Sequence, residues 1–562
     1  MTDSPTLSTS AYAPATEAGS PDGEVTAKLH QEIEERLRAQ LEQGILPQWT
    51  APQPHPSMSD HGMTAQFLAE PKKDADGQTP PVVDTGYYCR LFPASESAPD
   101  DKALMMLGAP CGPMDANPPG RPEHRISEQA PVKTPCLSSG AREKESDDLK
   151  TVPAGYTYFG QFLDHNITFQ ADATFDPGND PKANPNYRSG RISLEHVYGL
   201  GPQTQSFQYY DNKDNGKFWI DPDRAYDVPR NDEGVPLIAD PRNDNTVITI
   251  QLHLAFMKFH NAVVDMLIGQ VPDKKLFAAA KQTVVWHYQW LVLHDWLSKI
   301  IEPNIFDQIQ KNKGKFFHPQ PGPITLPVEF TVAGYRLHSL VKERYQLNHR
   351  TEGHLFHFRK PFSRLSPDDR IDWSYFFATG ERTPQYAKKF NGKVVHTFLN
   401  MPGPIDTPIE WLDNPVKTMP IPGVQPPEEY VPLRSIAVRN LLRGKAFRLP
   451  SGQAVAKKVI EAYKLGGHPC TNEELGLTLD GFGSEAPLWY YVMKEGAVAA
   501  EGSTLGPVGS VLVGEVLFGL LRADPTSFLY HNEHDKNHEW KPVLGAKPGV
   551  FTMADMLRVA GV

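Results

Sequence analysis

The sequence YFGQFLDHNITF at residues 158–169 decides the fold, because it sets an amide, a carboxylate and an imidazole inside an apolar and aromatic run. If the stretch is helical, Gln161 and His165 stand four residues apart on one face, with Asp164 beside them. Burying a polar group costs free energy unless the group has a hydrogen-bond partner, so the set indicates that a polar group is buried against this face. The plainer interpretation, a capped core helix with one satisfied histidine, fits this stretch equally well.

Three later stretches supply partners for such a helix. The stretch at residues 330–348 reads FTVAGYRLHSLVKERYQLN and contains His338. The stretch at residues 435–456 reads SIAVRNLLRGKAFRLPSGQAVA and contains Asn440 and Arg443, and the one at 239–264, ADPRNDNTVITIQLHLAFMKFHNAVV, begins around Arg242. In their order along the chain, the four stretches resemble the haem peroxidases of the peroxidase–cyclooxygenase superfamily, especially its bacterial members. The resemblance covers residues 153–530.

The resemblance implies a role for each of these polar residues. His165 is the acid/base on the distal side of a haem, Gln161 is its hydrogen-bonding neighbour, and Arg242 is the distal cation. His338 is the proximal iron ligand, and Asn440 accepts the N–H of its second ring nitrogen, which fixes the tautomer of the ligand. These roles suit peroxide activation, which needs one iron ligand, a base for the peroxide proton and a cation that stabilises the separating charge.

The cofactor that the resemblance implies is haem b. Arg443 pairs with a haem propionate, where a guanidinium fork suits a carboxylate. Mammalian members attach haem through two ester links, one from a carboxylate that matches Asp164 and one from a glutamate whose position here is Asn245. Because an amide cannot form that ester, the sequence allows at most one covalent link, through Asp164, and is also compatible with non-covalent haem.

The family's calcium site is altered in this sequence. Its first ligand, an aspartate directly after the distal histidine, is Asn166 here, and the loop before Val197 offers Ser189, Ser193 and Glu195. A hard cation prefers several carboxylates, so these four residues make only a weak cage for calcium.

The motif around the proximal histidine departs from the peroxidases in another direction. Peroxidases of this group read R-x-G-H, whereas this chain reads Tyr335-Arg336-Leu337-His338. Y-R-x-H resembles the fatty-acid dioxygenases and cyclooxygenases, in which the tyrosine carries a radical that removes hydrogen from a lipid chain. On a helix, Tyr335 would share the face of His338, with about 5–6 Å between the Cβ atoms. A core aromatic at Tyr335 is the competing interpretation.

Function is therefore expected to be that of a haem peroxidase, which reduces hydrogen peroxide while oxidising an organic or halide donor. The alternative is a fatty-acid dioxygenase that uses O2 and Tyr335 to oxygenate an unsaturated fatty acid. A helical scaffold or haem store that has lost turnover is a third hypothesis, and the intact set of Gln161, His165 and Arg242 argues against it.

The fold class predicted is mainly α, a single large haem peroxidase-like domain with long loops and little β structure. Residues 1–23, rich in Ser, Thr, Ala, Pro and Gly, are expected to be a disordered tail. Residues 24–150 form an extension, with an amphipathic helix followed by Pro-rich irregular chain on the surface, and residues 151–562 form the catalytic domain. Periodicity and motifs predict helices at residues 246–268, 276–301, 330–340, 435–444, 487–500 and 508–522.

Composition limits the partners. The formal net charge of −11 and the lack of a basic cluster argue against nucleic acid. The four cysteines lack metal-site spacing, although Cys111 and Cys136 could pair. No apolar run is long enough and uncharged enough for a membrane span, and the first residues do not resemble a secretory signal, so cytoplasmic residence is expected. Peripheral membrane contact through the amphipathic helix stays open, although docking on the main body is preferred.

Overall fold

The computed structural model describes residues 21–45, 86–116, 148–169, 185–210, 216–319, 324–401, 418–421 and 429–562. In these residues the chain is mainly helical, as predicted, and its strands are short. The expected tail falls largely on residues 1–20, which lie outside the described residues. The α-helices are α1 (Pro21–Glu42), α2 (Asp101–Leu107), α3 (Gly155–Ile167), α4 (Glu195–Tyr198), α5 (Val247–Leu267), α6 (Asp273–Trp290), α7 (Ser298–Ile300), α8 (Pro303–Asn312), α9 (His396–Leu399), α10 (Ile436–Ala446), α11 (Gly452–Tyr463), α12 (Leu488–Ala500), α13 (Pro507–Ala523), α14 (Phe528–His534) and α15 (Met553–Ala560).

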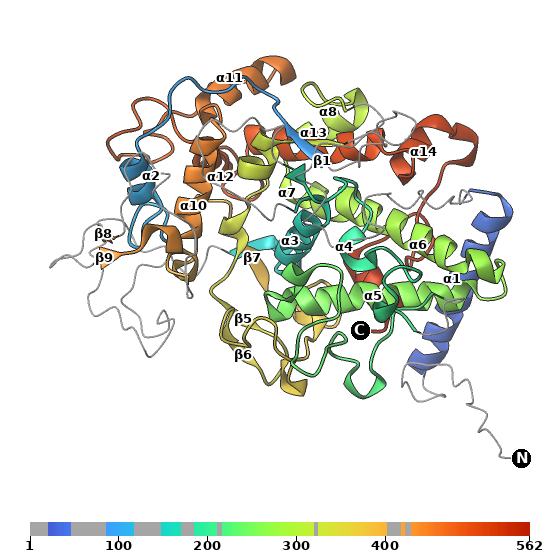
Figure 1. Ribbon diagram of the computed structural model, residues 1–562. Helices are drawn as coiled ribbons and strands as arrows, with labels where there is room; N and C mark the ends of the chain where they lie inside the picture. Colours follow the sequence, from blue (N-terminus) through green and yellow to red (C-terminus); the bar gives the residue numbers. More distant parts are fainter. Residues whose placement is uncertain are drawn as a thin grey trace, which may run out of the picture.

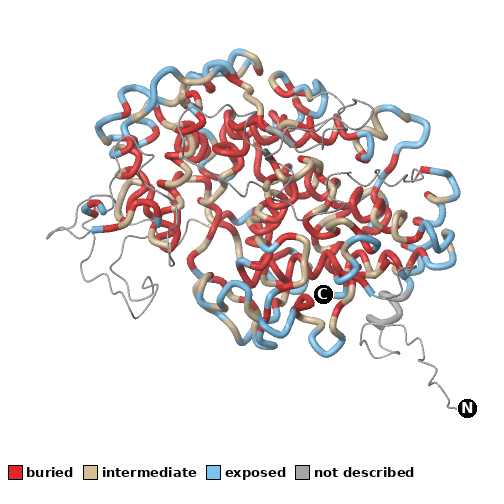
Figure 2. The backbone as a smooth tube through the Cα atoms, in the orientation of Figure 1, coloured by how far each residue is buried: buried red, intermediate tan, exposed pale blue. Residues whose placement is uncertain are grey.

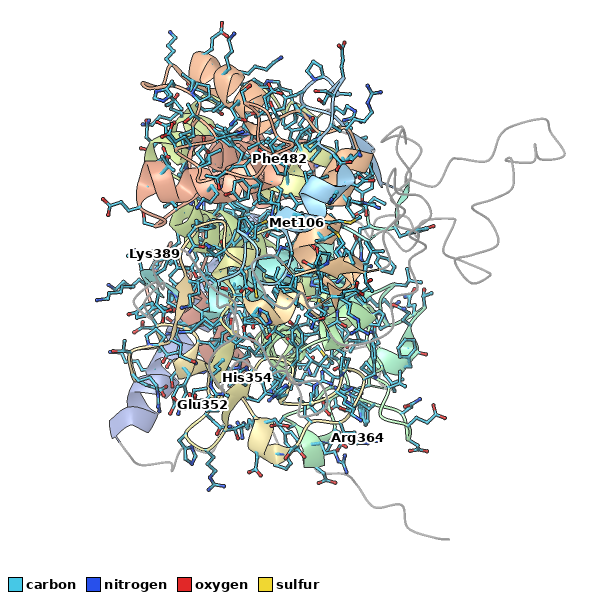
Figure 3. The ribbon with its side chains drawn as sticks, turned by 90° about the vertical axis from the view of Figure 1, so that its left-hand side faces the viewer. Met106, Glu352, His354, Arg364, Lys389 and Phe482 are labelled. Carbon is cyan, nitrogen blue, oxygen red and sulfur yellow. The ribbon has the colours of Figure 1, made fainter. Side chains whose placement is uncertain are left out.

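The strands pair into small sheets at the edges of the helical body. They are β1 (Gly86–Cys89), β2 (Asp148–Pro153), β3 (Pro185–Asn186), β4 (Thr325–Pro327), β5 (Arg344–Gln346), β6 (Glu352–His354), β7 (Tyr386–Lys388), β8 (Met419–Pro420) and β9 (Glu429–Tyr430). β1 lies between β3 and β4, antiparallel to the first and parallel to the second. In the side view, Glu352 and His354 of β6 lie near one end of the molecule, and Phe482 lies nearer the other (Figure 3).

The helix that carries the opening stretch, α3, lies at the centre of the molecule (Figure 1). It packs against α5, and α5 in turn packs against α6 and α15. α13 packs against α8, α11 and α12 and forms a second part of the core. Figure 2 shows that these central helices are buried along most of their length, whereas the peripheral loops are exposed. The most central helix of the fold is therefore the one with the polar set of Gln161, Asp164 and His165.

Local sequence explains where α5 begins and why it is buried. The Thr246 hydroxyl accepts the backbone N–H of Thr249 at 3.1 Å, which satisfies a donor that the first turn leaves without a helical partner. Apolar residues then occur on all sides of the helix. By length and composition α5 could span a membrane, but 83% of its most apolar window is buried inside the protein. Such burial is expected of a core helix.

Most predicted helices are present with small differences at their ends. The predicted helix at 276–301 is continuous, but residues Leu291–Leu297 form a π-helical stretch between α6 and α7. The predicted helix at 330–340 is not formed. A short π-helix covers Glu329–Gly334, the chain then leaves helical geometry, and a 3-10 turn covers His338–Leu340. Tyr335 and His338 therefore do not share one helical face.

The described part of the expected surface extension, residues 86–116, lies partly inside the molecule. Tyr88 and Phe92 are 4% exposed, and Gly108 packs so closely on α10 that a Cβ there would lie 2.7 Å from the backbone nitrogen of Val438. Proline and glycine content predicts irregular backbone but does not predict exposure, which is why this expectation was wrong here. Cys111 forms a disulfide, and Cys136, its suggested partner, lies outside the described residues.

The amphipathic helix α1 packs against the C-terminal part of the chain. Ile33 and Leu37 are buried, at 1% and 0% exposure. The side chain of Gln40 donates a hydrogen bond to the carbonyl of Lys541 at 2.8 Å. The described apolar face of α1 is thus at least partly covered by the protein itself.

Candidate functional site

One stripe of the central helix α3 remains accessible. Thr157, Gln161 and Asp164 are half-buried, whereas nearly all other residues of the helix are buried. Their spacing of four and three residues places them on one face. Gln161 and Asp164, two of the three polar residues that the sequence singled out, therefore lie on the accessible face of α3, whereas the third, His165, is buried.

His165 adjoins this stripe and is held by two groups. Its Nδ1 lies 2.8 Å from Oδ1 of Asn243, and its backbone carbonyl accepts a hydrogen bond from Nη2 of Arg242 at 3.0 Å. Burial, reinforced by the positive charge of Arg242, lowers the pKa of His165 to about 4. The imidazole is therefore neutral at neutral pH and able to accept a proton.

Arg242 sits in the 3-10 turn Pro241–Asp244, where Asp240 fixes it. The Asp240 carboxylate accepts from the backbone N–H of Arg242 at 3.0 Å and from its Nη2 at 2.7 Å, and it also pairs with Arg188. Burial alone would raise the pKa of Asp240, but the hydrogen bond and charges of the two arginines hold that pKa well below its usual range. The Arg242 guanidinium is 24% exposed and lies 4.5 Å from the ring centre of Phe169. The turn thus presents a cation beside His165.

A buried ion network holds the other end of the same turn. Asp244 accepts two hydrogen bonds from Arg230, at 2.8 and 2.9 Å, and pairs with Arg359. Arg230 also pairs with Asp227 at 2.8 Å. The Arg230 and Asp244 side chains are 0% exposed. Paired charges on both sides of Arg242 therefore fix the backbone that carries it.

We expect Asp244→Ala to lower the free energy of unfolding by about 3–5 kcal/mol, because the change leaves two buried guanidinium groups without this carboxylate. Urea unfolding at pH 7 measures the loss. Asp232→Ala, at an exposed position of the preceding loop, is the matched control and should change stability by less than about 0.5 kcal/mol. A loss below about 1 kcal/mol for Asp244→Ala would show that the network does not stabilise the turn.

His338 is half-buried and lies between Phe398 and Trp489. The ring centres are 5.9 and 6.0 Å away, respectively. Its Nδ1 lies 3.4 Å from the side-chain amide of Asn440 on α10. Burial, reinforced by Arg336, lowers the pKa of His338 to about 4. The predicted pair of His338 and Asn440 is therefore brought together.

Tyr335 is packed between aromatic rings. Its ring stacks on Phe330 with 4.9 Å between centres and meets Trp296 at 5.6 Å, and its hydroxyl donates to the carbonyl of Gly160 at 3.0 Å. A Cβ at Gly160 would lie 3.0 Å from the Trp296 ring, so glycine permits this close packing. Burial, with a contribution from Asp164, raises the pKa of Tyr335 well above its ordinary value. Tyr335 thus ties the segment before His338 to the α3 backbone.

Asp164 has an arginine partner, and Tyr88 lies within reach of several charges. Arg336 pairs with Asp164 at 3.7 Å. Burial and Asp164 raise the pKa of Tyr88 to about 12, against the opposing charges of Arg336, Arg443 and Arg242. Burial, together with the positive charge of Arg336, lowers the pKa of Arg443 to about 10. The sequence analysis assigned no role to Tyr88, which lies on β1.

Of the four residues that form the weak calcium cage in the sequence, only Ser189 and Glu195 bond to each other. Oδ1 of Asn166 accepts the backbone N–H of Leu194 at 3.1 Å, and its amide donates to the carbonyl of Arg191 at 3.2 Å. Oε1 of Glu195 accepts from the backbone and the hydroxyl of Ser189 at 2.9 and 3.2 Å. Ser193, the fourth residue of the set, is half-buried. Within the described residues no group of three or more His, Cys, Asp or Glu side chains is placed to hold a metal ion.

The described residues fit a haem. In both His165 and His338, Nδ1 faces a side-chain amide. An imidazole with its Nδ1 bonded presents Nε2 to iron or to a peroxide proton. The two segments are in direct contact, because Tyr335 bonds to Gly160 and Arg336 pairs with Asp164. The positive charges of Arg336 and Arg443, which act on each other, suit the two carboxylates of a haem.

Comparisons with known proteins identify a matching family model and a shared fold. Residues 202–372 match the family model for animal haem peroxidase. No curated protein sequence matches the chain. The fatty acid alpha-dioxygenase of Oryza sativa superposes with a TM-score of 0.52 at 14% identity, over 92% of this chain and 93% of that chain. Peroxidase A of Dictyostelium discoideum gives a TM-score of 0.47 at 12% identity, over 82% of this chain and 92% of that chain.

The rice enzyme shares the overall helical fold, and at such identity the likeness concerns the fold alone. The chain therefore shares the helical fold of the rice enzyme, and its residues 202–372 match the animal haem peroxidase family. The segment that matches the family model includes Arg242, Tyr335 and His338, whereas α3 and α10 lie outside it.

Proposed function

We propose that this chain, which carries an animal haem peroxidase domain at residues 202–372, reduces hydrogen peroxide while it oxidises an organic or halide donor. The observation that carries the proposal is the state of His165. Its Nδ1 bonds to Asn243, its pKa is near 4, and the Arg242 guanidinium lies beside it. A neutral imidazole next to a fixed cation is the pair of groups that heterolytic cleavage of a peroxide requires.

Haem, when bound, supplies the iron that receives peroxide and passes oxidising equivalents to the donor. Nε2 of His338 would be its protein ligand, with Asn440 holding the orientation of the ring. Rotating the Asn440 amide exchanges its nitrogen for its oxygen, which then accepts the Nδ1 proton of His338. Arg336 and Arg443 would receive the propionates.

His165 would transfer the proton, and Arg242 would stabilise the developing charge. Nε2 of His165 takes the proton from one peroxide oxygen and returns it to the other oxygen, which leaves as water when the O–O bond breaks. Arg242 stabilises the negative charge that develops on the leaving oxygen. Because Asp240 already holds Arg242, the cation needs little reorganisation during this step.

The second candidate function is a fatty-acid dioxygenase reaction that uses O2. The observation that favours it is the position of Tyr335, whose hydroxyl reaches the α3 backbone one residue before Gln161. In that reaction Tyr335 would lose a hydrogen atom and then remove one from the lipid. Its ring is 6% exposed and packed between Phe330 and Trp296, so a lipid would reach it only if these side chains moved. The peroxidase assignment needs no such movement.

A phenylalanine substitution separates the two candidates. We expect the haem-loaded Tyr335→Phe protein to keep the rate of peroxide-driven phenol oxidation within about threefold of the wild type. The lost hydroxyl bonds only a backbone carbonyl, so its removal should change the stability of the protein little. Oxygen uptake with linoleate, followed with an oxygen electrode, should be absent in both proteins.

Tyr288→Phe is the matched control, since Tyr288 is also fully buried and its hydroxyl has no hydrogen-bond partner among the described residues. Oxygen uptake in the wild type and in Tyr288→Phe that disappears in Tyr335→Phe would overturn the peroxidase proposal and establish the dioxygenase.

A further inference from the structure

Three buried side chains from different elements form a row behind the distal side of the site. His165 comes from α3, Asn243 from the 3-10 turn Pro241–Asp244, and His253 from α5. Oδ1 of Asn243 lies 2.8 Å from Nδ1 of His165, and its Nδ2 lies 2.9 Å from Nδ1 of His253. The three residues are 6%, 0% and 1% exposed. Both ends of the amide therefore bond to an imidazole in a place that water does not reach.

The two ends of an amide are chemically different, so the row has a direction. The carbonyl oxygen only accepts, which requires Nδ1 of His165 to carry its proton and leaves Nε2 unprotonated. The amide nitrogen only donates, which requires Nδ1 of His253 to be unprotonated. In a dry environment each bond is stronger than in water, and a mismatched donor or acceptor costs more. One amide thus determines the tautomer of both rings.

The backbone position of Asn243 is itself fixed. Its backbone N–H donates to the carbonyl of Asp240 at 3.1 Å, and the ion pairs of Asp240 and Asp244 hold the turn on either side. If the amide were reversed, its N–H would face Nδ1 of His165 and shift the ring proton to Nε2. His165 could then no longer accept a peroxide proton. The amide orientation therefore decides whether the distal histidine is a base.

We propose that Asn243, anchored by His253, is a positioning residue that holds His165 in the Nδ1-protonated tautomer and directs a free Nε2 to the haem side. The proposal deepens the peroxidase function and rests on it for its biological meaning. The hydrogen-bond geometry that it describes belongs to the chain itself. It can therefore be tested in protein without haem.

The first measurement is the tautomer of His165 in the haem-free wild type. Long-range proton–nitrogen correlation spectra of protein labelled with ¹⁵N-histidine distinguish the two tautomers, and loss of one signal set in His165→Gln assigns it. We expect Nδ1 to be protonated and Nε2 to be unprotonated at pH 7. The Nε2-protonated tautomer would overturn the proposal, whatever the haem-loaded protein does.

The second measurement is the association rate of hydrogen cyanide with the haem-loaded protein, followed by the shift of the haem absorption band. Cyanide must give up a proton to the distal base as it binds, so the rate reports the orientation of His165 without turnover. We expect Asn243→Leu to reduce the rate by about 10- to 100-fold, the usual effect of losing such a supporting bond. Asn243→Asp keeps an acceptor oxygen towards His165 and should retain the rate within about threefold.

The matched control is Asn261→Leu. Asn261 lies on α5 and bonds the backbone of Phe218 in both directions, at 2.8 and 2.9 Å, so its loss destabilises the fold without touching His165. Its cyanide rate should equal that of the wild type. Equal rates in Asn243→Leu and Asn261→Leu would overturn the proposal. An Nδ1-protonated His165 in a wild type that lacks peroxide turnover would instead refute the peroxidase function and leave the positioning role intact.

Discussion

His165→Leu is expected to lower the second-order rate constant for hydrogen peroxide by about 10²- to 10⁴-fold, the range that a positioned acid/base contributes. The reason is that the neutral His165 imidazole is the base beside Arg242. The rate is measured by stopped-flow mixing of the haem-loaded protein with peroxide. Haem content should not change, because the expected iron ligand, His338, belongs to another segment.

Two controls separate this loss from damage to the fold. His260→Gln replaces another buried histidine of the core, which bonds the Tyr198 hydroxyl and the Gly216 carbonyl and takes no part in the site. It should retain the peroxide rate. His338→Leu should instead abolish stoichiometric haem binding. A His165→Leu protein that reacts with peroxide within tenfold of the wild type would show that His165 is not the distal base.

Periodic and motif-bearing parts of the fold could be predicted from the sequence. α5 and α13 have long apolar patterns, and α3 and α10 carry their polar residues at helical spacing. For these helices the local pattern and the tertiary packing favour the same conformation. The pairing of His338 with Asn440 could be inferred only through the resemblance, because residues so far apart in sequence give no local signal of contact.

The segment around Tyr335 shows why the rest could not be predicted. Its backbone leaves the helix where two side chains, one of them distant in sequence, bond carbonyls that a further helical turn would use. Nε of Arg336 donates to the Thr331 carbonyl at 2.8 Å, and Nε1 of Trp489 donates to the Arg336 carbonyl at 2.8 Å. Trp489 is distant in sequence. A local pattern cannot include such a partner.

Asn243 and Tyr88 were missed for a related reason. Asn243 stands in the sequence Pro-Arg-Asn-Asp, which is typical of a solvated turn, and only the two ion networks make that turn buried. Tyr88 is influenced by the charges of Arg336, Arg443 and Arg242, although it lies on a strand that is far from them in sequence. In both cases the functional environment depends on burial, which composition did not reveal.

The free energy of unfolding is expected to fall steeply as the pH is lowered from 6.5 to 5. Burial is the largest cause that lowers the pKa of His253, His260 and His287, in each case to about 3. The unfolded chain takes up a proton on each near its ordinary pKa of 6.5, whereas the folded chain does not. Stability is therefore present above pH 6.5 and is lost as the pH falls, by up to about 1.4 kcal/mol per pH unit for each group.

These three histidines together predict a loss of up to about 6 kcal/mol between pH 6.5 and pH 5. His396 does not offset this loss of unfolding free energy. Burial alone would lower its pKa, but the hydrogen bond and charge of Asp115 raise it, so its stabilising effect is already complete below pH 6.5 and is lost only at higher pH. Urea unfolding at pH 7, 6 and 5 measures the slope.

His287 offers the sharpest test of this acid sensitivity, because its bonds require a neutral ring. Its Nε2 accepts the backbone N–H groups of Val543 and Leu544 at 3.1 and 3.3 Å, while Nδ1 faces the Thr283 carbonyl at 2.7 Å. A second proton on the ring would place an Nε2–H of His287 against the backbone N–H groups of Val543 and Leu544, with no acceptor between them. His287→Gln keeps an acceptor without titrating and should reduce the slope by about 1.4 kcal/mol per pH unit, whereas the exposed His318→Gln should leave it unchanged. Equal slopes in the wild type and His287→Gln would mean that the ring at position 287 is already protonated in the folded protein, or that its burial is incomplete.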